Sequence, residues 1–147
     1  MTAEFRMGST DGEHLSITVL GREHPDAENY WDRNWVISTI SVAIGGFTGH
    51  VRASLRTDEV HRFNKELKSV NQNLFGAAVL DSMEHWITLT VKAESRGRIQ
   101  VTGELRDRVG DGNVLTFEMA EVDQTYLGSW ITSLDDIEEA FPVIGKP

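Results

Sequence analysis

The sequence contains no cysteine. It therefore has no disulfide bond, thiolate metal site or cysteine nucleophile, a composition that fits a reducing compartment. It also lacks any run approaching the roughly 18 apolar residues that a membrane-spanning helix requires. The first 14 residues carry Glu4, Asp11 and Glu13 where an export signal would be basic and apolar. These absences predict a cytoplasmic protein with no membrane span and no visible export signal.

Positive charge is scarce as well. The chain has 14 Lys and Arg residues against 23 Asp and Glu residues, a formal net charge of −9 at pH 7. Because nucleic-acid backbones attract clustered basic side chains, this balance argues against non-specific binding of DNA or RNA. The acidic excess lies in residues 1–35 and 121–147. It either serves solubility alone or suits a basic protein partner.

Length and patterning favour one folded unit. A chain of 147 residues can bury a sufficient core without disulfides or metals. We find no internal repeat, no low-complexity tract and no linker rich in Pro, Gly and Ser. We predict a single domain over residues 1–147, in which residues 1–13 are a candidate flexible segment.

Alternating apolar and polar residues predict the strands. Residues 15–19 show the period-2 pattern of a strand with one buried face. Residues 36–44 and 47–56 form a predicted hairpin around a Gly-Gly turn. Three further alternating runs predict a meander, and they cover residues 87–91, 99–105 and 115–119. A short additional strand is expected at Val79 and Leu80.

Two segments have the periodicity of amphipathic helices. The first begins at Thr57, a good N-cap that acidic residues follow, and ends before Gly76. Its apolar stripe comprises Val60, Phe63, Leu67, Val70 and Leu74. The second is capped by Asp123 or Thr125 and ends before Pro142. Its apolar positions are Leu127, Trp130, Ile131, Leu134, Ile137 and Phe141.

These elements predict an α+β fold, mainly an antiparallel β-sheet of about six strands with two amphipathic helices packed on one face. The opposite face of the sheet is then open. It carries His50, Arg52, Ser54, Arg56, Trp86, Thr88, Thr90, Lys92, Arg98, Gln100, Thr102, Glu104 and Arg106. Such a face is either simply solvated or the contact surface of a dimer or another partner.

The sequence shows no pattern of catalytic or ligand-binding residues. The five histidines are scattered, without the spacing of a metal site. The turn at residues 107–113 lacks the ligand spacing of a calcium loop, and the glycines of residues 45–49 lack the Lys and the helix of a phosphate loop. No Gly-x-Ser-x-Gly motif occurs. We therefore expect no catalytic site, no cofactor and no metal.

Four carboxylates are clustered in the second predicted helix, namely Asp135, Asp136, Glu138 and Glu139. We expect all four on its outer, hydrated face, where they would not act as general acids or bases. That face is a candidate partner-binding surface.

Residues 30–35 are the least ordinary segment, because they contain two Trp and one Tyr in six positions. A structural interpretation buries Trp35 at the start of a strand and folds Trp31 over the sheet edge. A functional interpretation leaves Tyr30 or Trp31 exposed as an anchor for a partner. Tyr30, Trp31 and Asp32 are therefore candidate partner-binding residues.

A set of turn and aromatic motifs extends over nearly the whole chain. They lie at residues 19–23, 30–32, 34–35, 45–49, 103–107, 110–113, 123–127 and 140–142. With these motifs the sequence resembles the WapI-like family of bacterial immunity proteins. The resemblance implies a small cytoplasmic protein that neutralises the C-terminal domain of a polymorphic or contact-dependent toxin, a nuclease in the namesake case, by stoichiometric binding. The motifs assign no binding residue.

The leading hypothesis is a non-catalytic protein that binds a toxin through residues 30–35 or through the acidic second helix. A nucleic acid or a membrane is not expected as a partner. The alternative is a structural or regulatory protein that self-associates, as a homodimer, through the open sheet face with Trp86 as its signature. An enzyme is not supported, because no nucleophile, base and oxyanion donors converge.

Overall fold

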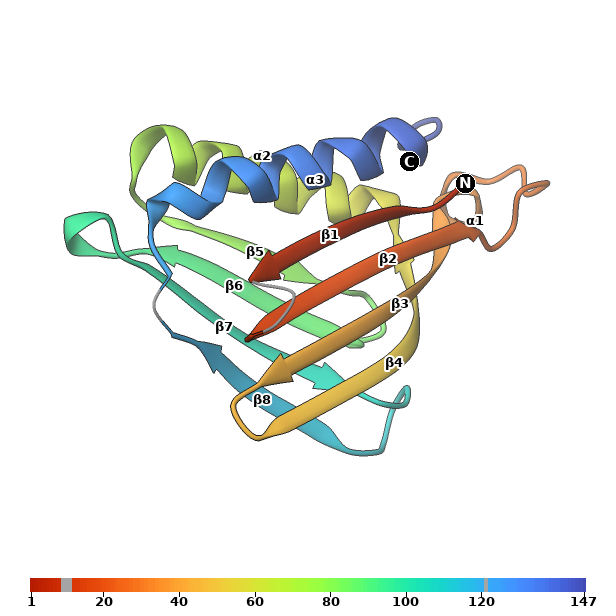
Figure 1. The fold of residues 1–147 in the computed structure, drawn as a ribbon. Helices are drawn as coiled ribbons and strands as arrows, with labels where there is room; N and C mark the ends of the chain where they lie inside the picture. The colour runs from red at the N-terminus through yellow and green to blue at the C-terminus, as the bar shows by residue number, and fades with distance from the viewer. Residues whose placement is uncertain (9–11, 121) are drawn as a thin grey trace.

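The computed structural model describes residues 1–8, 12–120 and 122–147. Its strands form two antiparallel four-stranded sheets, each of which follows the order of the chain (Figure 1). The first sheet comprises β1 (Ala3–Gly8), β2 (His14–Arg22), β3 (Trp35–Ile44) and β4 (Phe47–Arg56). The second sheet comprises β5 (Ala77–Asp81), β6 (Ile87–Ala93), β7 (Ile99–Arg106) and β8 (Val114–Met119).

Three α-helices accompany the sheets in the described part of the chain. They are α1 (Tyr30–Arg33), α2 (Thr57–Asn73) and α3 (Leu127–Ala140), with short 3₁₀ turns at η1 (Ser95–Gly97) and η2 (Gln124–Tyr126). Helix α2 packs along β5, α3 packs along β1, and the two helices pack on each other. The helix pair therefore spans the gap between the edge strands of the two sheets (Figure 1). Among the described residues, no helix combines the length and apolar character needed to cross a membrane.

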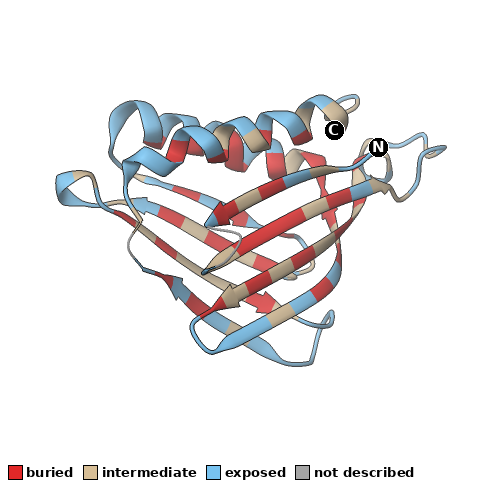
Figure 2. Cartoon of the chain, viewed as in Figure 1, coloured by how far each residue is buried: buried red, intermediate tan, exposed pale blue. Residues whose placement is uncertain are grey.

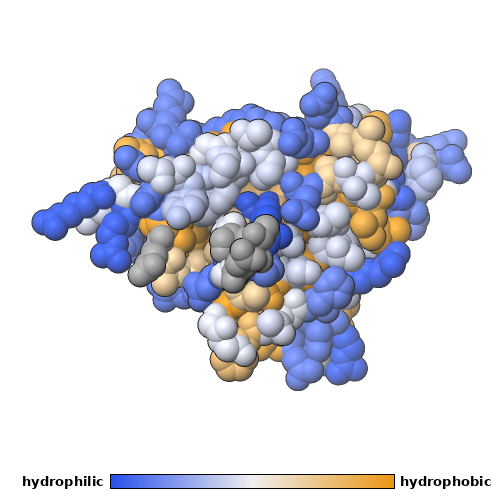
Figure 3. All heavy atoms as spheres, viewed as in Figure 1, coloured by the Kyte–Doolittle hydropathy of each residue, from blue (hydrophilic) through white to orange (hydrophobic). Residues whose placement is uncertain are grey.

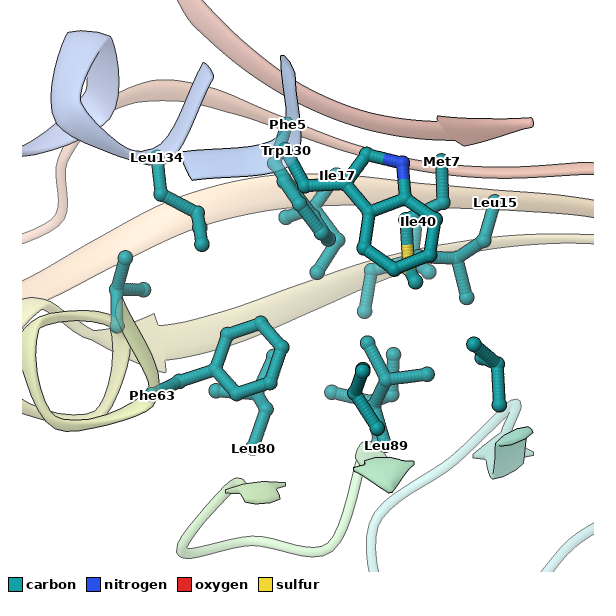
Figure 4. Close-up of a cluster of buried hydrophobic side chains, with 14 of the residues drawn as sticks. Phe5, Met7, Leu15, Ile17, Ile40, Phe63, Leu80, Leu89, Trp130 and Leu134 are labelled. Atoms are coloured by element: carbon teal, nitrogen blue, oxygen red, sulfur yellow. The ribbon is translucent and has the colours of Figure 1, made fainter. Parts of the chain in front are cut away.

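The inner faces of both sheets and the helix pair enclose one hydrophobic core. Buried and more exposed residues alternate along the strands (Figure 2). In Figure 4, Phe63 of α2 and Trp130 of α3 converge on Ile40 of the first sheet and Leu89 of the second. Each of these four side chains is at most 2% exposed. Because burying one such side chain contributes about 1.5–3 kcal/mol, this core holds the helices to both sheets.

The prediction of a single sheet of about six strands with two helices is wrong in its arrangement. In the described part of the chain, eight strands form two antiparallel sheets and are accompanied by three helices, so the α+β class is confirmed. Alternation indicates which side of a strand is buried, but not whether two strands share a sheet. The connection through α2 separates the strands into two layers. Strand β1 was also missed, because it falls within the candidate flexible segment; residues 9–11 of that segment lie outside the described part of the chain.

The predicted open face is divided between two surfaces. His50, Arg52 and Ser54 lie on β4 of the first sheet, whereas the predicted residues between 88 and 106 lie on or next to β6 and β7 of the second. Arg56 is buried, at 3% exposure, and Trp86 is partly buried and packs against the core. The structure therefore contradicts a single open face that presents Trp86.

The two long helices confirm the periodicity of the sequence, with corrections at the ends of α2. Arg56 is the N-cap of α2 in place of Thr57, and its N–H donates to Glu59 Oε1 at 2.9 Å. Leu74 lies outside the buried stripe, as an exposed C-cap in the left-handed region with φ 51°. Asp123 caps η2, which leads directly into α3.

Candidate functional site

Helix α1 arises from a local capping arrangement in the aromatic segment. The side chain of Asn29 accepts a hydrogen bond from Asp32 N at 2.9 Å and donates one to Asp32 Oδ2 at 2.9 Å. An Asn at this position satisfies an N–H that a short helix would otherwise leave free. The Asp32 side chain, which we predicted as a partner contact, therefore also stabilises α1.

Asn34 fixes α1 to the rest of the molecule. Its side chain is fully buried, and its Oδ1 accepts hydrogen bonds from Thr57 Oγ1 and Ile144 N, both at 2.9 Å. Its Nδ2 donates to Tyr30 O at 2.7 Å and to Ile144 O at 3.0 Å. Figure 1 shows α1, the start of α2 and the C-terminus at one end of the molecule. A buried amide with these partners holds the aromatic segment in one position.

Trp31 is half-exposed and stacks on a buried cation. The guanidinium of Arg56 lies 4.2 Å from the centre of the Trp31 ring and 5.8 Å from that of Trp35. Tyr30 contacts the edge of Trp31 at 4.9 Å between ring centres. The Arg56 side chain is only 4% exposed, whereas Trp31 is 49% exposed. One face of Trp31 is thus fixed by a cation–π contact while the rest of the ring is accessible.

The charge of Arg56 is balanced on its other side. Its Nη2 lies 2.7 Å from Asp58 Oδ2, and its Nη1 lies 3.8 Å from the sulfur of Met83. Met83 itself is 59% exposed. Arg56 therefore contacts both Trp31 and Met83, and these three residues are here called the Trp31 cluster.

A cavity of about 540 Å³ adjoins the Trp31 cluster, between α2 and β5. Two carboxylates of α2 accept backbone hydrogen bonds there. Glu66 accepts one from Val79 N of β5 at 2.9 Å, and Glu59 accepts one from Met83 N, in the turn after β5, at 2.6 Å. Because unpaired N–H groups of an edge strand invite association, the contact of Glu66 with Val79 helps to protect this edge of the second sheet.

Among the residues that line the cavity, Glu59 has the carboxyl whose pKa is shifted most. Its burial raises the pKa of its carboxyl from 4.5 to about 6, against the lowering effect of the N–H groups of Arg56 and Met83. Burial, followed by the charge of Asp58, also raises the pKa of Tyr30. The effect of Asp58 on Tyr30 connects α1 electrostatically to the cavity.

The prediction that all four acidic residues of α3 are hydrated fails for Glu138, which is partly buried, and two of the four have partners on α2. Asn64 of α2, which is buried, donates to Asp135 Oδ1 at 2.8 Å and to Glu138 Oε2 at 2.5 Å. Asp135 also pairs with Lys68 at 2.8 Å, and Glu138 with His61. The hydrogen bond from Lys68 is the main reason that the pKa of Asp135 is lowered.

Three of the four residues remain exposed, namely Asp135, Asp136 and Glu139, whereas Glu138 is partly buried against α2. Asp136 and Glu139 point to solvent. On the face drawn in Figure 3, hydrophilic residues predominate and hydrophobic residues occupy separate patches. Among residues 1–8, 12–120 and 122–147, no three His, Cys, Asp or Glu side chains are grouped as they would be around a metal ion.

The sequence predicted Trp31 as a candidate contact, but it gave no indication of the contacts of Arg56 and Met83 or of the cavity. Arg56 follows the alternation of an exposed strand position, so its burial under two Trp rings had no signal in the sequence. Met83 lies in the turn between β5 and β6, which comes next to α1 only through the packing of the second sheet.

Comparison with known proteins gives one match. A family model described as the Immunity protein WapI-like family matches residues 6–142. No curated protein and no solved structure matches the chain.

Proposed function

The chain belongs to the immunity protein WapI-like family, and on this premise we propose that it neutralises a toxin domain by forming a stoichiometric complex with it in the cytoplasm. Neutralisation requires binding and no catalysis. A complex that covers the active surface of the toxin is sufficient to stop its activity.

The Trp31 cluster is the observation that supports a particular binding surface for the toxin. Trp, Arg and Met are enriched at protein interfaces, and Trp in particular forms binding hot spots. The guanidinium of Arg56 stacks on one face of the Trp31 ring at 4.2 Å. The ring is therefore already fixed in position, and it loses little conformational entropy when a partner covers it. Together with Tyr30 and Asp32, this cluster is the proposed toxin-binding surface.

The charge of the protein supports a basic toxin domain. A net charge of −9 accelerates encounter with a positively charged partner and suits a nuclease, whose active surface attracts phosphate. Asp136 and Glu139 are the second candidate contact, because both are exposed and, within the described residues, neither is hydrogen-bonded to α2. Asp135, which is exposed as well, and Glu138 accept hydrogen bonds from Asn64 of α2, so changes at these two residues would also alter stability.

The test uses any toxin C-terminal domain that a gene neighbouring the gene of this protein encodes. Co-expression should rescue growth, and the two purified chains should form a complex of one-to-one mass. Trp31→Ala should weaken the complex by about 2 kcal/mol, roughly 30-fold in Kd, as for a hot-spot aromatic. Phe75→Ala is the matched control, since Phe75 is an aromatic residue that is 81% exposed and lies at the other end of α2. The absence of both rescue and complex would reject the function, and equal effects of the two variants would reject the surface.

A further inference from the structure

The cavity between α2 and β5 has an uneven balance of charge. Four carboxylates line it, from Asp58, Glu59, Glu66 and Asp81, against the guanidiniums of Arg56 and Arg62. With all six groups ionised, its formal charge is −2. Any partner that enters the cavity therefore meets an excess of negative charge.

Most of these groups already have partners inside the protein. Glu66 accepts a hydrogen bond from Val79 N of β5, Glu59 accepts one from Met83 N in the following turn, and Arg62 lies 3.5 Å from Glu66. Arg56 is paired with Asp58 and covered by Trp31, so its positive charge is not presented to the cavity.

One carboxylate of the cavity remains open to a partner. Asp81 is 59% exposed at its side chain, and its nearest contacts are weak, with Thr88 Oγ1 at 3.4 Å and His85 Nδ1 at 3.8 Å. This carboxylate would gain from a cationic N–H donor.

The walls of the cavity also offer apolar contact. Val79 is 38% exposed and Met83 is 59% exposed, and both line the same space. Lys and Arg bury their aliphatic stems along apolar surface while the charged head reaches an acceptor. Met adapts its shape to such a stem.

We propose that this cavity binds a Lys or Arg side chain of the partner protein, with the stem against Val79 and Met83 and the cationic head at Asp81. The proposal rests on the proposed function, because the cavity adjoins the Trp31 cluster. A partner segment that covers Trp31 would place a basic residue in the cavity, so the two features form one composite surface.

The test requires no toxin. The full chain, labelled with ¹⁵N, is titrated with the peptide acetyl-Gly-Arg-Gly-Arg-Gly-amide and with the same peptide carrying citrulline for arginine. Citrulline keeps the shape of the side chain and removes its charge. Binding of the arginine peptide should shift amide signals of residues 56–66 and 79–83 and the indole signal of Trp31, whereas the citrulline peptide should not.

Two variants then assign the site. Asp81→Asn should weaken binding of the arginine peptide by about fivefold, the effect of losing one nearby charge at the surface. Asp111→Asn removes one exposed carboxylate in the turn between β7 and β8, away from the cavity, and should leave the affinity unchanged. Asp58→Asn is less suitable because it leaves the buried Arg56 without its ion pair.

Equal binding of the two peptides, or equal effects of the two variants, would overturn the proposal. The outcomes are separable from those of the rescue assay. Rescue of growth without binding of the arginine peptide rejects the basic-residue cavity and retains neutralisation. Specific binding of the arginine peptide without rescue retains the cavity and rejects neutralisation.

Discussion

Asn34 and Ile144 lie 110 residues apart in the sequence and are joined by two hydrogen bonds. The N–H of Ile144 donates to Asn34 Oδ1, and Asn34 Nδ2 donates to the carbonyl oxygen of Ile144. The side-chain amide of Asn34 also accepts a hydrogen bond from the hydroxyl of Thr57 and donates one to the carbonyl oxygen of Tyr30. One side chain thus connects α1, the start of α2 and the C-terminal segment, and it positions the proposed binding surface on the core.

Asn34→Ala should therefore be strongly destabilising. It leaves donors and acceptors of Tyr30, Thr57 and Ile144 without their partner in a buried position, which costs about 2–4 kcal/mol of the free energy of unfolding. Urea denaturation measures this loss. Asn71→Ala, at an exposed position of α2, is the control and should change stability by less than about 0.5 kcal/mol. Similar values for the two variants would show that the Asn34 network contributes little.

Glu59 should make stability depend on pH. Its pKa is about 6 in the folded protein against 4.5 ordinarily, so the folded state holds the proton more tightly than the unfolded chain. This contribution is fully present below pH 4.5 and is lost as the pH rises through 6. A difference of about 1.5 pKa units corresponds to about 2 kcal/mol.

Glu59→Gln removes this titration. Unfolding free energies of both proteins are measured by urea denaturation at intervals from pH 4 to pH 7.5. The wild type should exceed the variant by about 2 kcal/mol more at pH 4 than at pH 7.5. A constant difference across this range would contradict the assignment of the raised pKa to Glu59.

Local patterns predicted the elements of this fold better than their assembly. The period of Leu15, Ile17 and Val19 predicted β2, and the spacing of Val60, Phe63 and their stripe predicted α2. The division into two sheets depends on where α2 directs the chain after β4, and on the convergence of Phe63 with Leu89 in one core. Such long-range packing has no periodic signature in the sequence.

The same limit applies to the candidate site. Trp31 was noticed because aromatic residues are costly to expose, and its exposure to solvent is now observed. The burial of Arg56 against the Trp31 ring depends on the contact between β4 and α1, and the hydrogen bond of Asp135 depends on Asn64 of another helix. An acidic run in one helix gives no information about which members face a neighbouring helix.

The acidic residues of α3 should separate into two classes on mutation. Glu138→Ala removes an acceptor from the buried Asn64 and the partner of His61, and should cost about 1–2 kcal/mol. Glu139→Ala, one position along the helix and exposed, should change stability by less than about 0.5 kcal/mol. Thermal or urea unfolding distinguishes the two.

The different structural roles of these acidic residues also determine which of them can be used to test the contribution of charge to toxin binding. Reversal of Asp136 and Glu139 to Lys should leave folding intact, so a weaker complex would identify a contact. Reversal of Asp135 or Glu138 confounds binding with stability. Equal stability of the Glu138→Ala and Glu139→Ala variants would contradict the interhelical role of Glu138.

Two glycines should respond in opposite directions to the same change. Gly103 lies in the middle of β7, where an added Cβ would come within 2.5 Å of Cζ of the buried Phe117 ring. Gly103→Ala must displace that ring from the core, which should cost about 1–3 kcal/mol. Gly128, exposed in the first turn of α3, has no atom within 4 Å of its added Cβ. Gly128→Ala should therefore stabilise the protein by about 0.4–1 kcal/mol, because alanine restricts the unfolded chain and favours the helix. Urea denaturation of the two variants side by side tests the packing of Phe117 over β7, and a neutral Gly103→Ala would refute it.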